Sequence, residues 1–173
     1  ELSRKDEIFL SKSGLISIAG GKLTGYRKMA DRVLTAVSKQ LTPEQKSKLK
    51  RSFTKKIPLV TPAIKTSKEV VAYQDELKGQ LAEMEITDPY MSWYLCTTYG
   101  KNADLILDKK RTFKEGSAQE QLIRAELWYC IQHEMTNGLA DFFVRRTARL
   151  YFDIDSVAQF MEIILHDCIH YLD

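Results

Sequence analysis

The chain opens with a pattern typical of a β-hairpin. Two short apolar stretches, residues 7–10 and 15–19, flank a four-residue segment of turn composition, Ser11-Lys12-Ser13-Gly14. Gly20 and Gly21 end the second stretch, and apolar residues then recur every three or four positions as far as Leu41. The pattern predicts a hairpin that leads through two glycines into a helix over about 22–40.

From residue 67 onward the apolar spacing is almost wholly helical. Asp88 precedes Pro89, a proline suited to the first turn of a helix, and Ser117 stands three residues before Glu120, as in a capping box. The expected helices begin near the following residues: Ser67, Asp88, Asn102, Ser117, Leu139 and Asp155. The fold predicted is mainly α, a helical bundle preceded by a short β-hairpin and one helix.

Residues 41–66 separate these two regions. The segment is rich in lysine and arginine, contains three of the four prolines and has little periodicity. It predicts a short helix after Pro43 and then an exposed connector, so we place a domain boundary between 1–41 and 42–173. The basic run has no interleaved aromatic residues, which indicates a solvated segment rather than a nucleic-acid site.

Composition narrows the class of protein. The 173 residues are 44% hydrophobic and 28% charged, which is typical of a globular chain and excludes wholesale disorder. No apolar run approaches the ~20 residues of a membrane span, and the charged N-terminus is unlike a secretory signal. Cys96, Cys130 and Cys168 are widely spaced, which suits buried thiols in a reducing compartment. We therefore expect a cytoplasmic protein.

The segment Gly20-Gly21-Lys22-Leu23-Thr24 carries the clearest chemical signal. Two glycines allow a sharp bend and a close backbone approach, and the helix that follows presents free N–H groups to an anion or an electron-rich oxygen. The segment is not a P-loop, because Leu23 stands where that motif needs Ser or Thr. An anion-binding bend and a purely structural strand-to-helix turn both remain open at this point.

Two other groups of residues give weaker evidence of a metal or ligand site. His166 and His170 share a helix face at the spacing of zinc ligands, but they lie opposite the apolar stripe expected on the last helix, so a solvated face is favoured over a metal site. Arg145 and Arg146 follow an aromatic pair, and we favour an ion-pair network between helices over a ligand site. The apolar stripe comprises Val157, Phe160, Met161, Ile164, Leu165, Cys168 and Leu172.

Several segments together resemble a known family. They are Ser3-Arg4-Lys5-Asp6-Glu7-Ile8, the run from Gly14 to Ala30, Tyr99-Gly100 with Asn102-Ala103, and Asp141-Phe142-Phe143-Val144-Arg145-Arg146-Thr147. In this order the chain resembles the FAD-dependent (aerobic) glycerol-3-phosphate dehydrogenases and the related α-glycerophosphate oxidases. The resemblance implies a C-terminal fragment, in which residues 1–41 end an FAD-binding domain and residues 42–173 form an all-helical cap.

The resemblance also implies a site. Gly20, Gly21, Lys22, Leu23 and Thr24 would lie beside the flavin of FAD, where the helix N-terminus favours negative charge. Lys22, and more weakly Arg4, would bind the substrate. No catalytic residue and no metal ligand is expected in this fragment, because the base would lie in the missing N-terminal part.

The reaction implied is hydride transfer from C2 of sn-glycerol 3-phosphate to FAD, which yields dihydroxyacetone phosphate. Electrons would pass to quinone or to oxygen, and the partners would be the missing FAD domain and the inner face of the membrane, touched peripherally. The fragment alone would be inactive. The alternative is a freestanding helical protein-interaction module, with the basic connector as its docking surface.

Overall fold

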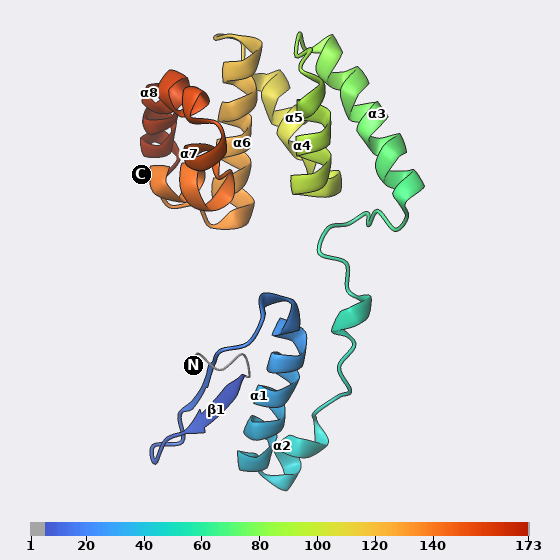
Figure 1. Ribbon diagram of the computed structural model, residues 1–173, viewed down its shortest axis with the longest axis vertical. Helices are drawn as coiled ribbons and strands as arrows, with labels where there is room; N and C mark the ends of the chain where they lie inside the picture. Colours follow the sequence, from blue (N-terminus) through green and yellow to red (C-terminus); the bar gives the residue numbers. More distant parts are fainter. Residues whose placement is uncertain (1–5, 173) are drawn as a thin grey trace. The chain divides into compact units, whose positions relative to one another are not determined.

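The computed structural model describes residues 6–172, which form two compact units divided between Ile57 and Pro58 (Figure 1). This division places the short helix and the first part of the connector, as far as Ile57, in the N-terminal unit and the rest of the connector in the C-terminal unit. A functional boundary at 41 and 42 stays a prediction. Among the described residues, no helix is both long and apolar enough to cross a bilayer.

The N-terminal unit consists of a hairpin and helices, as the apolar pattern predicts. Strand β1 (Glu7–Leu10) pairs antiparallel with β2 (Ile16–Ala19), and Ile8 lies opposite Ile18. The remaining elements are η1 (Leu23–Gly25), α1 (Tyr26–Gln40), α2 (Pro43–Ser47) and η2 (Thr54–Lys56). A capping box between Thr42 and Gln45 begins α2, which confirms the short helix expected after Pro43.

This unit lacks an enclosed core among its described residues. Strand β2 packs beside α1, yet no residue of α1 is buried. Large apolar side chains are instead open to solvent, among them Phe9, Leu10, Leu15 and Leu34, each at least half exposed. Because no residue of α1 is buried, packing of the hairpin on this helix adds little apolar burial to the unit.

The C-terminal unit is entirely helical in its regular structure. Its elements are α3 (Ser67–Glu83), α4 (Pro89–Tyr99), η3 (Gly100–Asn102), α5 (Ala103–Thr112), α6 (Ala118–Glu134), η4 (Asp141–Arg146), α7 (Arg149–Phe152) and α8 (Ile154–Leu172). Asp88 accepts a hydrogen bond from the Tyr90 N–H at 2.9 Å, and Ser117 accepts one from the Glu120 N–H at 3.2 Å. These caps and the helical fold class confirm the prediction, but the Ser117 N–H does not donate back to the Glu120 side chain, so the expected capping box is only half formed.

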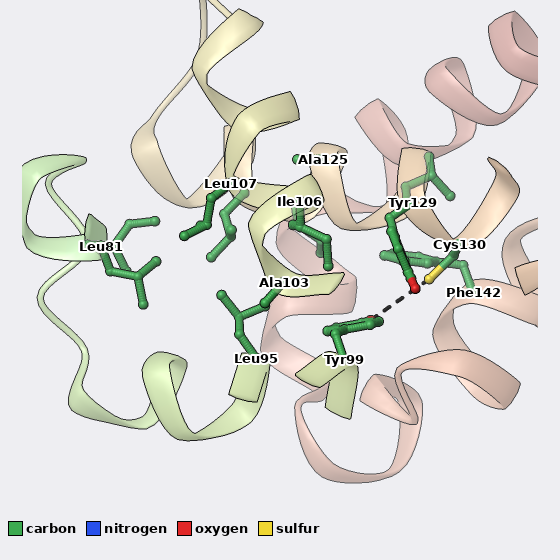
Figure 2. Close-up of a cluster of buried hydrophobic side chains, with 14 of the residues drawn as sticks. Leu81, Leu95, Tyr99, Ala103, Ile106, Leu107, Ala125, Tyr129, Cys130 and Phe142 are labelled. Carbon is green, nitrogen blue, oxygen red and sulfur yellow. Dashed lines mark hydrogen bonds between the residues drawn. The ribbon is translucent and has the colours of Figure 1, made fainter. Parts of the chain in front are cut away.

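The core of this unit is closed. Leu81 of α3, Leu95 of α4, Ile106 of α5 and Phe142 of η4 are all at most 1% exposed (Figure 2). Each such side chain contributes roughly 1.5–3 kcal/mol through burial. The three cysteines are free and buried, as expected, and the Tyr99 hydroxyl lies 3.9 Å from the Cys130 sulfur.

The expectation of one regular helix over 139–149 is wrong. Residues 141–146 form a wider π-helical turn, in which the Thr147 N–H donates to the Phe142 carbonyl, and Ala148 then takes a left-handed conformation. The wide turn buries Phe142 and Phe143, which are adjacent in sequence. Packing of both rings therefore overrides the helical spacing.

Two of the expected helix caps, those of α8 and α5, are also wrong. Asp153, not Asp155, caps α8 by accepting from the Ser156 N–H, and the Asn102 amide donates to the Tyr129 hydroxyl instead of capping α5. The apolar stripe predicted on α8 is buried only in part. Its buried members are Val157, Phe160, Ile164 and Cys168, whereas Met161, Leu165 and Leu172 are 39–49% exposed.

Candidate functional site

The bend after β2 is set by two glycines in the left-handed region. Gly20 and Gly21 have φ angles of 86° and 87°, after which Lys22 is extended and η1 begins. A side chain at Gly21 would place its Cβ 2.7 Å from the Met29 sulfur. The positive φ favours glycine at position 21, because a residue with a Cβ would be strained there even if the flexible Met29 side chain moved aside.

The bend exposes an electropositive helix end. Neither Lys22 before η1 nor Gly25 before α1 supplies a side-chain cap, so the N–H groups at this end have no side-chain partner within residues 6–172. The first turn of α1 has no acidic residue and carries Arg27 and Lys28. Positive partial charge and cationic side chains at one helix end favour an anionic or electron-rich neighbour.

The candidate residues form one exposed segment. Leu23 is 90% exposed, and Lys22 and Thr24 are exposed as well. Within residues 6–172, Lys22 has no ion-pair partner. Arg4, the second candidate for substrate binding, lies outside the described residues. The free ammonium of Lys22 is thus available to an external anion.

Other candidates are not gathered into a site. Arg145 pairs with Asp141 of the same turn at 2.6 Å, and Arg146 is exposed, so this pair does not join helices. The Asn137 N–H and then Arg145 hold the pKa of Asp141 below its usual value. His166 and His170 are exposed, and the described residues contain no cluster of three or more side chains suited to a metal ion.

Comparison with known proteins decides the family. Residues 20–170 match the family described as the C-terminal domain of alpha-glycerophosphate oxidase. The chain belongs to this family. The resemblance inferred from the sequence is confirmed, and the match begins at Gly20, the first residue of the bend.

The relatives that match this chain, and a solved structure similar to it, are about three times its length. The chain is 38% identical to aerobic glycerol-3-phosphate dehydrogenase of Bacillus subtilis (strain 168) and 36% identical to that of Staphylococcus aureus (strain USA300). In both cases 95% of the chain aligns but covers 30% of the relative. The structure resembles glycerol-3-phosphate dehydrogenase from Bacillus halodurans complexed with FAD, at a TM-score of 0.79 and 36% identity, over 96% of this chain and 33% of that one.

The family domain also contains a buried polar cluster that sequence analysis missed. The Glu126 side chain is 2% exposed; its Oε1 accepts from the hydroxyls of Tyr94 and Tyr99, and its Oε2 accepts from the Arg149 guanidinium at 2.8 Å. Burial, and next the Glu126 carboxylate, raise the pKa of both tyrosines, which keeps them protonated donors. We name Tyr94, Tyr99, Glu126 and Arg149 the Glu126 cluster.

A second buried ion pair joins α6 to α8. Arg124 donates to both carboxylate oxygens of Asp167, at 2.7 and 3.0 Å, and the Asp167 side chain is 4% exposed. Both this pair and the Glu126 cluster link residues more than 20 positions apart. Spacing along one helix carries no signal for such contacts, which explains why neither was predicted. The two groups hold helices together, and the buried Arg149 Nε has no hydrogen-bond partner among the described residues.

Proposed function

We propose that this chain is the C-terminal part of a flavoprotein that oxidises sn-glycerol 3-phosphate to dihydroxyacetone phosphate, with FAD as the hydride acceptor. The observation that carries the proposal is the family match over residues 20–170, together with a structural neighbour complexed with FAD. The chain spans about 30% of the curated relatives it matches. The remaining part of such an enzyme would supply the FAD-binding domain.

The state of the N-terminal unit supports a missing neighbour. Its described residues leave Phe9, Leu10, Leu15 and Leu34 at least half exposed, and its hairpin has two strand edges without a third strand. Exposed apolar surface and open strand edges are features that proteins normally cover. An FAD-binding domain preceding residue 1 would provide both a sheet and an apolar partner.

The bend has the chemistry that a flavin neighbour requires. FAD, when bound, would accept the hydride from C2 of the substrate. Gly20 to Thr24 would lie beside the flavin, because the glycines carry no Cβ and the uncapped helix end favours negative charge on a neighbouring group. Lys22 would bind the substrate phosphate through its free ammonium, and Arg4 would assist.

The proposal assigns the remaining steps outside this chain. The base that takes the C2 hydroxyl proton would belong to the N-terminal part, so the chain alone would have no activity. Electrons would leave to quinone or to oxygen. The complete enzyme would be cytoplasmic or peripheral on the inner face of the membrane.

Lys22 provides the test. In the complete polypeptide, Lys22→Ala should lower kcat/KM for glycerol 3-phosphate about 100-fold, because a charge-assisted contact to the phosphate is lost. Dye reduction measures the rate, and flavin absorbance checks that FAD stays bound. Lys39→Ala, at the far end of α1, is the matched control and should leave kcat/KM unchanged. Equal kcat/KM in both variants would remove Lys22 from the site.

A further inference from the structure

A groove in the N-terminal unit lies between the start of α1 and the basic connector. Its volume is about 970 Å³, and residues between 24 and 31 line one wall while residues 51–56 line the other. Two hydrogen bonds join the walls, since the Arg27 guanidinium donates to the Thr54 carbonyl at 3.0 Å and to the Thr54 hydroxyl at 2.7 Å. Part of the connector is therefore attached to α1, and we name the space between them the basic groove.

The charge of the basic groove is almost entirely positive. Five of its lining side chains are cations, and one, Asp31, is a carboxylate. The cations are Arg27, Lys28, Arg51, Lys55 and Lys56. Within residues 6–172 none of the five forms an ion pair, and the oxygens that Arg27 contacts on Thr54 are neutral. Five positive charges less one negative charge leave a net charge of +4, which no other described side chain neutralises.

This charge favours a compact ligand with more than one phosphate group. Guanidinium and ammonium groups are common partners of phosphate oxygens. One phosphate group carries a charge of about −1.5 to −2 near pH 7, which leaves roughly half of the net charge unmatched, whereas two groups come close to matching it. Ligand pockets commonly have volumes of about 300–1,000 Å³, so the groove also has room for the organic part of such a molecule.

The shape of the basic groove favours a soluble ligand over a membrane surface. Its cations line a concave space between two walls, whereas the cations of a segment that lies on a membrane form one exposed face. A bilayer surface is flat on this scale and would reach only the rim of the groove. A small anion can instead contact α1 and the connector at the same time.

We propose that the basic groove binds a soluble organic diphosphate other than the FAD of the proposed reaction. Lys28 of α1 and the three cations of the connector contact the phosphate groups, while Arg27 holds the connector in place through Thr54. The groove is built wholly from residues of the family domain, 20–170, whereas the FAD-binding part would precede residue 1. Lys22 does not line the groove, so this site is separate from the substrate contact proposed for that residue.

Isothermal titration of the complete FAD-loaded polypeptide with inorganic pyrophosphate tests the proposal. The expected Kd is about 100 µM at about 50 mM salt, and it should rise at high salt because these exposed charges are screened. Lys55→Gln with Lys56→Gln should raise Kd about tenfold, since two phosphate contacts are lost. The matched control, Lys46→Gln with Lys50→Gln, removes the same charge from the same basic segment outside the groove and should change Kd less than about threefold.

Other outcomes would assign the groove differently and overturn the proposal. If the complete polypeptide does not bind pyrophosphate, the rest of the chain covers the groove; if it binds only vesicles of anionic lipid, the partner is a membrane. Loss of flavin absorbance in the Lys55 and Lys56 variant would assign the groove to FAD itself. Lys22→Ala should change Kd for pyrophosphate less than about threefold, and weakening by this variant or by the control equal to that of the groove variant would place the anion elsewhere. Circular dichroism checks the folding of every variant, and activity on glycerol 3-phosphate tests the proposed function separately.

Discussion

The Glu126 cluster sets up a sharp test of what stabilises the C-terminal unit. Replacing Glu126 by Gln keeps the size and shape of the side chain and removes its charge. The amide oxygen can still accept from the tyrosines, but the Arg149 guanidinium, whose side chain is 11% exposed, loses its carboxylate at 2.8 Å. Burial acts to lower the pKa of Arg149, and Glu126, Tyr94 and Asp153 together raise it. Because a guanidinium does not lose its proton in proteins, Arg149 stays a buried cation after the substitution.

The size of the destabilisation follows from the Arg149 charge, which Glu126→Gln leaves without its carboxylate partner. Removing one partner of a buried ion pair costs about 3–5 kcal/mol. Asp153 remains 2.9 Å from Arg149, although its side chain is 45% exposed, so the lower end of the range applies. We expect Glu126→Gln to lower the free energy of unfolding by about 3 kcal/mol and Tm by about 12 °C.

Urea unfolding followed by tryptophan fluorescence measures this change. Both tryptophans of the chain, Trp93 and Trp128, lie in the C-terminal unit, so the signal reports on that unit alone. Glu76→Gln is the control, since it removes the partner of Lys101 in an ion pair whose carboxylate is 55% exposed, and should cost less than about 1 kcal/mol. Arg149→Met in the Glu126→Gln background should cost less than the sum of the single changes. If Glu126→Gln and Glu76→Gln destabilise equally, the cluster does not stabilise the unit as argued.

Three further changes have defined outcomes. Asp88→Ala removes the side-chain cap of α4 and should lower the free energy of unfolding by about 1 kcal/mol, measured by urea unfolding, with Asp75→Ala inside α3 as the control. Gly100, with φ 55° and ψ −140°, has a backbone conformation outside the left-handed helical region that essentially only glycine adopts, so Gly100→Ala should cost about 1–3 kcal/mol even though a Cβ there meets Val60 only at ordinary contact distance. Gly100→Asn should be no better in the same assay, and a Gly100→Asn variant as stable as the original chain would contradict this account. The lowered pKa of Asp141 means that its contribution is present above about pH 4 and is lost as the pH falls through the folded-state value. The urea midpoints of the original chain and of Asp141→Asn should therefore differ at pH 6 and converge near pH 2, and a constant difference would refute the assignment.

Local signals in the sequence predicted much of the fold. The glycine-ended hairpin, the helix after Pro43 and the start of α4 at Pro89 each depend on a turn or cap within a few residues, and each is confirmed. The expectation at 139–149 is wrong because burial of two adjacent phenylalanines selects a π-helical turn. Helical spacing records which residues share a face, not how many residues fit in each turn.

The candidate site, like the fold, could be predicted from sequence only where its residues are contiguous. Gly20 to Thr24 could be found from sequence because bend, charge and helix end are contiguous, although its role beside a flavin stays a prediction. The partners of Glu126 and Asp167 come from other helices, and only the folded unit brings them together. Likewise, the apolar spacing on α8 predicts one broad stripe and cannot tell its buried half from its exposed half.

Exposed apolar residues have different structural causes in the two units. The C-terminal unit has a closed core and two buried ion pairs, so the exposed apolar side chains of α8, among them Leu165, are not needed to close that core. The N-terminal unit has no buried residue in α1, so Phe9, Leu10 and Leu34 belong to a core that is incomplete among the described residues. A polar substitution at Leu165 should therefore leave helix content and the urea midpoint of the tryptophan signal unchanged. A polar substitution at Leu34 should instead act on stability, and only in a polypeptide that supplies the rest of that core.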